Sequence, residues 1–260
     1  MTDVTEVQTW VREALDILKT KELPKIKKYP DVSLNKRIEH TLLKPTATPK
    51  EIDEFCKTAA FLNVHAVCVA PTNVKQVADF FREKRQSEGF MICEPRNEAQ
   101  LFEFQDVKIV SVCGFPLGNS TINSKMNEAE EAVRNGALEI DFVPNLSNIE
   151  LLDVVSIQNE VKLISKRAVV KVILETGLFD PRKTVYAAVA AICGGCWCLK
   201  TSTGFGSRGA SVEDVQLLRS ISNTPIKASG GIKTRKSSET LIAAGADLIG
   251  TSSSVEILKV

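Results

Sequence analysis

The sequence of 260 residues has few of the features that mark nucleic-acid-binding, membrane and secreted proteins. Lysine and arginine (33) nearly cancel aspartate and glutamate (32), so there is no basic stripe for nucleic acid and no polybasic segment for a membrane surface. No apolar run approaches about 18 residues, and the N-terminus lacks the apolar segment of a signal peptide. We therefore expect a soluble, cytoplasmic protein that acts on a small molecule.

Histidine is scarce, and the cysteines do not form a recognisable framework. His40 and His65 are the only histidines, which is too few for a histidine-rich metal site, and we expect both to be structural. The seven cysteines are odd in number, and most fall in apolar patterns where free cysteine behaves as a small buried hydrophobe. Cys193 and Cys196 have a Cys-x-x-Cys spacing, but no second pair completes a zinc site. The sequence predicts no metal, no cofactor and no disulfide framework.

Among the residues that are present, two lysines occupy matching points of two successive strand-like segments. Lys200 ends the apolar run that begins at Cys196, and Lys227 follows Pro225 and Ile226. An ammonium at the end of an apolar strand is poorly solvated, and a second ammonium nearby repels it, so both effects favour the neutral amine. Because a neutral amine can attack a carbonyl, the pattern predicts that Lys200 is a nucleophile.

Strand and helix patterns alternate along the chain, which indicates parallel strands joined by helices. The predicted strands are Ile38–Leu42, His65–Val69, Val107–Cys113, Leu138–Val143, Val169–Leu174, Cys196–Lys200, Pro225–Ala228 and Asp247–Gly250. Gly136, Gly194 and Gly245 each stand where a helix should end and the next strand begin. Eight such units predict an α/β fold, a (β/α)8 TIM barrel, with a doubly wound open sheet as the alternative because periodicity does not show closure.

The N-terminal segment has a pattern of its own. From about Val4 to Lys19, apolar residues recur at helical spacing, and a lysine-rich linker bounded by prolines follows. We therefore divide the chain into an additional N-terminal helix with its linker (1–30) and a barrel domain (31–260). The stretch 88–106 is long for one connection and has room for an extra hairpin or helix.

The active site of a barrel of this kind lies at the C-terminal ends of its strands. Asp141, Lys171, Glu175, Lys200 and Lys227 fall at such positions. For Lys171 and Glu175 we prefer a structural role, as a rim cation or a loop cap. Lys200 has few structural reasons to follow an apolar run, and strands about 4.8 Å apart would make it a neighbour of Lys227 if both point inward.

The loops after the seventh and eighth strands suit an anion. Gly230 and Gly231 permit close approach of the backbone, and the segment 250–254 offers amides and hydroxyls where a helix begins. Thr203 and Gly204, after the sixth strand, add a further donor. Barrels often bind phosphate at this position, so we expect a phosphorylated carbonyl compound as substrate.

Eight short segments then occur in a specific order: Ile38–Pro45, Val67–Pro71, Gly114–Gly118, Glu139–Asp141, Lys171–Thr176, Lys200–Phe205, Lys227–Gly231 and Gly250–Ser253. With these segments the chain resembles the deoxyribose-phosphate aldolase family from about Arg37 to its end. The resemblance implies a metal-independent class I aldolase, a carbon–carbon lyase without a cofactor. Such an enzyme reversibly cleaves 2-deoxy-D-ribose 5-phosphate into acetaldehyde and D-glyceraldehyde 3-phosphate, in deoxyribonucleotide catabolism.

The resemblance also implies roles for individual residues. Lys200 would be the Schiff-base nucleophile, while Asp141 and Lys227 would form a proton relay in which a cationic Lys227 also keeps Lys200 neutral. The residues expected to bind the substrate and its phosphate are Thr203, Gly204, Gly230, Gly231, Ser252 and Ser253. The residues expected to be possible site-lining positions are Glu39, Cys68 and Lys171.

Two positions depart from the family pattern. Glu39 stands where an aspartate is usual, and Ala70 stands where an asparagine is usual. They leave open two alternatives: a non-catalytic phosphosugar-binding protein, and another phosphosugar lyase or isomerase on the same barrel that uses the lysines to bind an anion. We expect a homodimer, because closed twofold association is the commonest among soluble proteins.

Overall fold

A computed structural model describes residues 4–20, 32–87 and 107–259. Its strands are β1 (Ile38–Leu42), β2 (Ala66–Val69), β3 (Lys108–Cys113), β4 (Glu139–Phe142), β5 (Val169–Ile173), β6 (Cys198–Lys200), β7 (Ile226–Ser229) and β8 (Leu248–Thr251). Every predicted strand is present, with ends within two residues of the expected ones. The α-helices are α1 (Val4–Thr20), α2 (Pro49–Leu62), α3 (Val74–Ser87), α5 (Ile122–Arg134), α6 (Leu146–Glu150), α7 (Val154–Ser165), α8 (Pro181–Cys193), α9 (Val212–Ile221), α10 (Arg235–Ala244) and α11 (Ser254–Leu258), with 3₁₀ helices η1 (Leu34–Arg37) and η2 (Pro71–Asn73).

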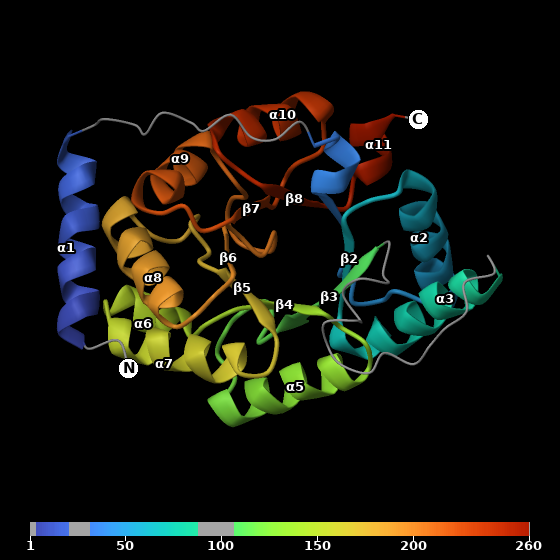
Figure 1. Cartoon of the computed structure of the whole chain (residues 1–260), viewed down its shortest axis with the longest axis horizontal. Coiled ribbons are helices and arrows are strands. Elements are labelled where there is room, and N and C mark those ends of the chain that lie inside the picture. The colour runs from blue at the N-terminus through green and yellow to red at the C-terminus, as the bar shows by residue number, and fades with distance from the viewer. Residues whose placement is uncertain (1–3, 21–31, 88–106, 260) are drawn as a thin grey trace.

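The eight strands form a closed parallel barrel in chain order. The barrel closes where β1 pairs with β8, with Ile38 opposite Ile249 and His40 opposite Thr251. Helices surround the strands on the outside (Figure 1). The (β/α)8 barrel is therefore confirmed, and the pairing of β1 with β8 excludes the open doubly wound sheet.

Local sequence signals set the helix ends. Thr48 caps α2 by accepting a hydrogen bond from the Glu51 amide, and the Glu51 carboxylate accepts one from the Thr48 amide in return. Ser211 and Asp214 form the same reciprocal cap at the start of α9. At the end of α10, Gly245 takes a φ of 120°, a conformation that side chains with a Cβ rarely adopt.

Helix α1 packs outside the barrel against α8 and α9 (Figure 1). Val7, Val11 and Ala14 are buried and belong to the same apolar core as the outer faces of the strands. The predicted N-terminal helix is thus present. The linker and the 88–106 stretch lie outside the described residues, and the division at residue 30 stays a prediction.

Two apolar regions are separated by the strands. The larger lies between strands and helices and is rich in valine, isoleucine and alanine. The smaller lies inside the barrel and consists of Ala66, Cys68, Val110 and Val112, with Leu43 and Phe115 packed on it. Strands β2 and β3 supply that smaller cluster, which leaves the rest of the barrel interior to other side chains.

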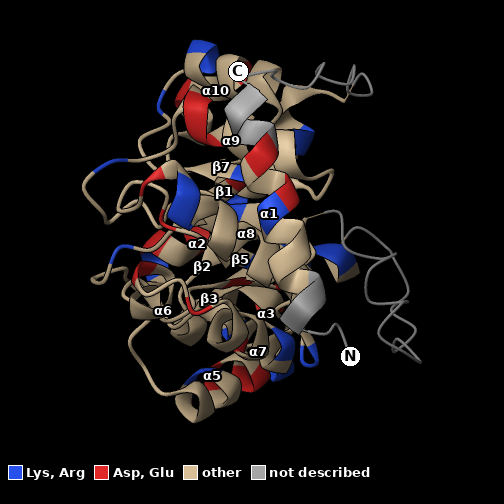
Figure 2. Ribbon diagram, turned by 90° about the vertical axis from the view of Figure 1, so that its left-hand side faces the viewer, with Lys and Arg blue, Asp and Glu red and all other residues tan. Residues whose placement is uncertain are grey.

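Charged residues of both signs are scattered over the elements seen from the side. Lysine and arginine (blue) and aspartate and glutamate (red) both appear on several helices and loops in this view (Figure 2). Within the described ranges, none of the helices combines the length and the apolar character needed to cross a membrane.

Candidate active site

The strand register brings the predicted catalytic side chains together inside the barrel. Lys200 on β6 is the direct neighbour of Lys227 on β7, and Asp141 on β4 is the direct neighbour of Lys171 on β5. All four side chains are buried, and none is more than 3% exposed. The two lysines therefore point inward side by side, which meets the condition under which the sequence analysis expected them to be neighbours.

Asp141 is shared by three lysines. Its Oδ2 accepts hydrogen bonds from Lys200 Nζ at 2.7 Å and from Lys227 Nζ at 2.6 Å. Its Oδ1 lies 3.4 Å from Lys171 Nζ. Burial alone would raise the pKa of Asp141, but Lys200, Lys227 and Lys171 outweigh burial and hold the pKa well below its usual value. Asp141 is therefore a carboxylate with more cationic neighbours than it can neutralise.

Glu39 supports the same cluster from β1. Its Oε2 accepts a hydrogen bond from Lys227 Nζ, and its Oε1 lies 3.3 Å from Lys171 Nζ. Burial lowers the pKa of Lys227, but Asp141 and Glu39 outweigh burial and keep the pKa above its usual value. Lys227 is thus held as an ammonium between two carboxylates. Glu39 therefore gives this lysine a second carboxylate partner.

Two further charged residues, which the sequence analysis did not single out, continue the cluster toward the other end of the barrel. Glu139 Oε2 lies 2.5 Å from Lys171 Nζ, and Glu139 Oε1 accepts a hydrogen bond from Lys108 Nζ at 2.9 Å. Burial raises the pKa of Glu139, but Lys171 and Lys108 hold it down to about 2. Burial lowers the pKa of Lys171, but Glu39, Glu139 and Asp141 raise it well above its usual value. Glu139 and Lys171 are therefore both charged.

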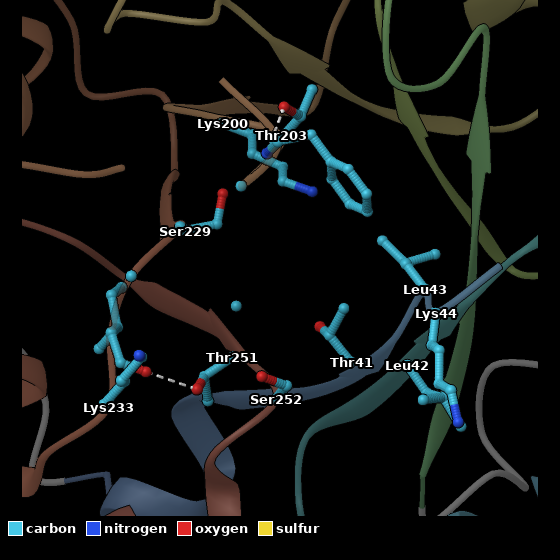
Figure 3. Close-up of a pocket in the computed structure, with 16 residues that line it drawn as sticks. Thr41, Leu42, Leu43, Lys44, Lys200, Thr203, Ser229, Lys233, Thr251 and Ser252 are labelled. Atoms are coloured by element: carbon cyan, nitrogen blue, oxygen red, sulfur yellow. Dashed lines mark hydrogen bonds between the residues drawn. The ribbon is translucent and has the colours of Figure 1, made fainter. Parts of the chain in front are cut away.

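A pocket of about 320 Å³ opens above Lys200 at the C-terminal ends of the strands. It is lined by Thr41, Leu42, Leu43, Lys44, Lys200, Thr203, Gly204, Phe205, Ser229, Gly230, Gly231, Ile232, Lys233, Gly250, Thr251 and Ser252. Lys200 and Thr203 lie on one side of the pocket, opposite Thr251 and Ser252 (Figure 3). Lys200 is thus the member of the buried cluster that reaches the pocket wall.

The predicted residues separate into two groups by location. Thr203, Gly204, Gly230, Gly231 and Ser252 line the pocket with Lys200. The remaining ones lie outside its wall: Asp141, Lys227, Glu39, Cys68, Lys171 and Ser253. The backbone amide of Ser253 donates instead to the Thr251 hydroxyl at 2.9 Å. The three residues expected as possible site-lining positions are therefore buried and do not line the pocket.

Cys68 contacts the same carboxylate oxygen as Lys200. Its Sγ is 3.7 Å from Asp141 Oδ2, to which the thiol donates. Burial, followed by the charge of Asp141, raises the pKa of the Cys68 thiol to about 12. The thiol therefore stays protonated at neutral pH and adds no charge to the cluster.

Two consecutive glycines, Gly230 and Gly231, line the pocket where the sequence predicts an anion site. Gly230 has a φ of 91°, and a Cβ there would lie 2.9 Å from the Cα of Gly209, so both conformation and space require glycine. Gly231 has a φ of 73° and open space in the direction of a Cβ. The double glycine therefore leaves its backbone accessible to a ligand in the pocket.

Three polar pocket residues were not singled out from the sequence: Thr41, Ser229 and Lys233, whose side chain is exposed. Thr251 also lines the pocket and lies in the segment 250–254, where an anion site was expected. Lys44 lines it too, but its amine is paired with Glu51 at 2.7 Å. The available signal for Lys233 was its place directly after the Gly-Gly-Ile segment of the predicted anion loop.

Both histidines lie away from the pocket wall. His40 Nδ1 is 2.9 Å from Ser254 Oγ, and its ring stacks on Phe55 at 4.4 Å. Burial lowers the pKa of His40 to about 4 and also lowers the pKa of His65, so both rings are neutral at pH 7. Within the described part of the chain, no group of three or more His, Cys, Asp and Glu side chains could hold a metal ion.

The chain was compared with known proteins. No family model matches it. The deoxyribose-phosphate aldolase of Brevibacillus brevis is 38% identical over 232 residues, which cover 87% of this chain and 96% of that protein. A solved structure described as QR15, an aldolase, is 36% identical with a TM-score of 0.75 and covers 88% of this chain and 95% of its own. The tetrameric deoxyribose phosphate aldolase of Aeropyrum pernix is 29% identical with a TM-score of 0.72, covering 97% of this chain and 96% of its own.

Proposed function

Because the chain belongs to the deoxyribose-phosphate aldolase family, we propose that Lys200 is its Schiff-base nucleophile and that Asp141 and Lys227 move the protons. The enzyme is an aldehyde-lyase that reversibly cleaves 2-deoxy-D-ribose 5-phosphate into acetaldehyde and D-glyceraldehyde 3-phosphate. The observation that carries the residue assignment is the shared carboxylate, since Asp141 Oδ2 lies within hydrogen-bond distance of both lysines.

In the cleavage direction, the neutral amine of Lys200 attacks C1 of the open-chain sugar and forms a carbinolamine. Loss of its hydroxyl as water gives a protonated imine, which withdraws electrons from the C2–C3 bond. The C3 hydroxyl loses its proton, the bond breaks, and glyceraldehyde 3-phosphate leaves an enamine on Lys200. Protonation of the enamine at C2 and hydrolysis of the imine release acetaldehyde and restore the amine.

Each proton transfer needs a donor or an acceptor beside Lys200. Lys227, kept as an ammonium by Asp141 and Glu39, is suited to donate to the departing hydroxyl and to be recharged from water. Asp141 stays a carboxylate and can orient the Lys200 amine through its 2.7 Å hydrogen bond. The two residues thus form the relay together: Lys227 is the proton donor, and Asp141 positions both amines and exchanges protons with Lys227.

The same proposal places the substrate phosphate at the far side of the pocket. Gly230 and Gly231 offer accessible backbone there, Ser252 offers a polar group, and Lys233 adds a cation on the wall. Phosphate sites of barrels are commonly built from these loops. A sugar held in this way has its carbonyl end directed toward Lys200, across the pocket in Figure 3.

Two features of the setting belong to the proposal as well. We place the reaction in deoxyribonucleotide catabolism in the cytoplasm, because its substrate is a small phosphosugar. We also propose a homodimer, as closed twofold association is the most frequent assembly. The Aeropyrum pernix relative is tetrameric, so mass measurement in solution decides between the two assemblies for this chain.

The decisive experiment is reductive trapping. Incubation with 2-deoxyribose 5-phosphate and sodium borohydride should leave a reduced adduct that peptide mapping places on Lys200, while a coupled assay detects glyceraldehyde 3-phosphate. A Lys200→Ala variant should fold, show no adduct and lose more than about 10⁴-fold in turnover. Absence of adduct and product from a folded wild type that still binds the phosphosugar would instead identify a non-catalytic binder.

A further inference from the structure

The barrel interior contains more buried charge than a nucleophile and its proton relay require. From the pocket downward, each charged group contacts the next in the order Lys200, Asp141, Lys227, Glu39, Lys171, Glu139 and Lys108. Lys108, the first residue of β3, lies at the N-terminal end of the barrel, and its side chain is 27% exposed. Its Nζ lies 5.7 Å from the Trp197 ring centroid. We call this series the interior charge chain.

The interior charge chain is balanced in one protonation state of Lys200. Three of its residues are carboxylates, and three lysines other than Lys200 oppose them. A net charge held away from water is unfavourable, because neither solvent nor a counter-ion compensates it. Counted over all seven groups, the charges sum to zero when Lys200 is an uncharged amine, which is the form that attacks a carbonyl, and to one positive charge when Lys200 is an ammonium. Lys108, at the N-terminal end of the series, is its most exposed member.

We infer that Lys171 and Glu139, neither of which lines the pocket, are positioning residues that act through Asp141 on the charge state of Lys200, with Lys171 favouring the neutral amine and Glu139 opposing it. The inference rests on the proposed function, since it assumes that Lys200 is the nucleophile. Lys171 lies 3.4 Å from Asp141 Oδ1, while the opposite oxygen holds Lys200 and Lys227. The positive charge of Lys171 thus offsets part of the negative charge of Asp141, which would otherwise stabilise a Lys200 ammonium.

Glu139 acts in the opposite sense. Its Oε2 is 2.5 Å from Lys171 Nζ, so it neutralises part of the charge that Lys171 presents to Asp141. Lys171 also contacts Glu39 at 3.3 Å and therefore keeps carboxylate partners when Glu139 is removed. Conversely, Glu139 keeps Lys108 at 2.9 Å when Lys171 is removed. Glu139 and Lys171 can consequently be replaced by uncharged side chains, singly or together, and each of their buried partners still keeps at least one oppositely charged contact.

Other charged and titratable groups surround Lys200 and stay the same in these variants. They are Asp141 on β4, Lys227 on β7, Glu39 on β1, Cys68 on β2, Glu175 after β5, and Lys44 and Lys233 on the pocket wall. Glu175 Oε2 accepts a hydrogen bond from the Thr203 amide, and Lys44 is paired with Glu51. A change in pH dependence between variants therefore reports the altered members of the interior charge chain.

The test is the pH dependence of kcat/KM for 2-deoxyribose 5-phosphate, which reflects ionisation of the free enzyme. Lys171→Met leaves one excess negative charge, so we expect the acid limb to move to higher pH by about one unit and kcat/KM near neutral pH to fall about tenfold. Glu139→Gln should move the limb to lower pH. The double variant restores the charge balance of the series. Its acid limb in the kcat/KM profile should therefore return to within a few tenths of a pH unit of the wild-type position.

A matched control is Lys125→Met, which removes another fully buried lysine, one that is paired with Glu160 outside the barrel interior. It should destabilise the protein without moving the acid limb. Identical limbs for wild type and Lys171→Met, or shifts of both single variants in the same direction, would overturn the inference. If Lys171→Met does not fold, Glu139→Gln decides alone: a limb moved to lower pH supports the inference, and an unmoved one rejects it.

The pH dependence of reductive trapping with acetaldehyde and borohydride separates this inference from the proposed function, because trapping requires no carbon–carbon cleavage. If the pH profiles of the trapping rate shift in opposite directions in Lys171→Met and Glu139→Gln, the inference is supported even in a protein that does not cleave the phosphosugar. Cleavage by wild type with unshifted trapping profiles would leave the aldolase assignment intact and reject the role of Glu139 and Lys171.

Discussion

The inside of the barrel and the layer between strands and helices both bury lysine, but they do so differently. In the outer layer, Lys125 is fully buried, its Nζ is 2.9 Å from Glu160, and it lies 5.2 Å from the centroid of the Phe142 ring. Within the barrel, Asp141 alone contacts three lysines. Lys125 thus has a carboxylate of its own, whereas Lys200 contacts a carboxylate that two other lysines also contact.

This difference explains how one residue type serves two purposes in one molecule. The outer layer is otherwise packed with valine, isoleucine and alanine, so its ion pair is an isolated structural contact. The barrel interior keeps apolar packing on β2 and β3 and gives its remaining space to charges that meet below the pocket. Lys200 thus differs from Lys125 in two respects: it lines a pocket, and its carboxylate partner also contacts other lysines.

The largest effect is expected when Asp141, the carboxylate that contacts three lysines inside the barrel, is neutralised. Asp141→Asn keeps the side-chain size but removes the charge that orients Lys200 and Lys227, so kcat should fall about 10²–10³-fold. KM should change little, since the phosphate end of the pocket is untouched. Steady-state kinetics measure both constants.

The matched control in the outer layer is Glu160→Gln. Glu160 accepts hydrogen bonds from Lys125 and from the Asn145 amide, so its replacement should lower the melting temperature while kcat of the folded enzyme stays within about twofold of wild type. Equal losses of kcat in Asp141→Asn and Glu160→Gln would show that the two regions do not differ in the way described.

The next largest effect concerns stability in the outer layer. Lys125→Met should reduce the free energy of unfolding by about 3 kcal/mol, because it leaves Glu160 without its buried cation. Urea denaturation measures the change. Lys75→Met, which breaks the exposed pair with Asp79, should barely move the denaturation midpoint, and a shift as large as that of Lys125→Met would contradict the assigned role of burial.

The smallest effect is expected at the pocket wall, where Lys233 is exposed to solvent. Lys233→Met should raise KM for 2-deoxyribose 5-phosphate about tenfold and leave kcat unchanged, because a phosphate contact of this kind contributes equally to ground and transition states. Added salt should narrow the difference from wild type, since an exposed cation is screened.

Lys236 on helix α10 does not line the pocket and supplies the control of equal charge. Lys236→Met should leave KM at the wild-type value. A Lys233→Met variant whose kcat falls while its KM is unchanged would place Lys233 with the interior lysines and not with the phosphate end of the pocket.

Local patterns in the sequence predicted much of the fold and the core of the site. Strand ends were correct to within two residues because apolar runs, glycine stops and helix caps are encoded by neighbouring residues. Lys200 was singled out by its position after an apolar run, whereas Glu139 and Lys108 gave no comparable signal. A charged residue at the start of a strand reads as a solvated end until its inward direction is known.

The placement of Lys171 and Ser253 shows the same limit. Lys171 was weighed as a rim cation and as a possible site-lining residue, but the barrel buries it completely between three carboxylates. Ser253 was expected at the phosphate, and this stays a prediction; its amide donates to the Thr251 hydroxyl, an arrangement that the sequence pattern did not indicate. One residue of difference along a strand or loop reverses the direction of a side chain, and the sequence pattern does not resolve such a difference.

The sequence by itself determined that eight strand–helix units follow one another and that a lysine stands in each of two successive strands. The tertiary structure alone decided that the barrel closes and which carboxylate each lysine meets. Lys200 and Asp141 are 59 positions apart, and Lys227 and Glu39 are 188 apart, so their contacts depend on the register of every strand between them. Because electrostatic interactions depend on distances of a few ångströms and on exclusion of water, the chemistry of these lysines exists only in the closed barrel.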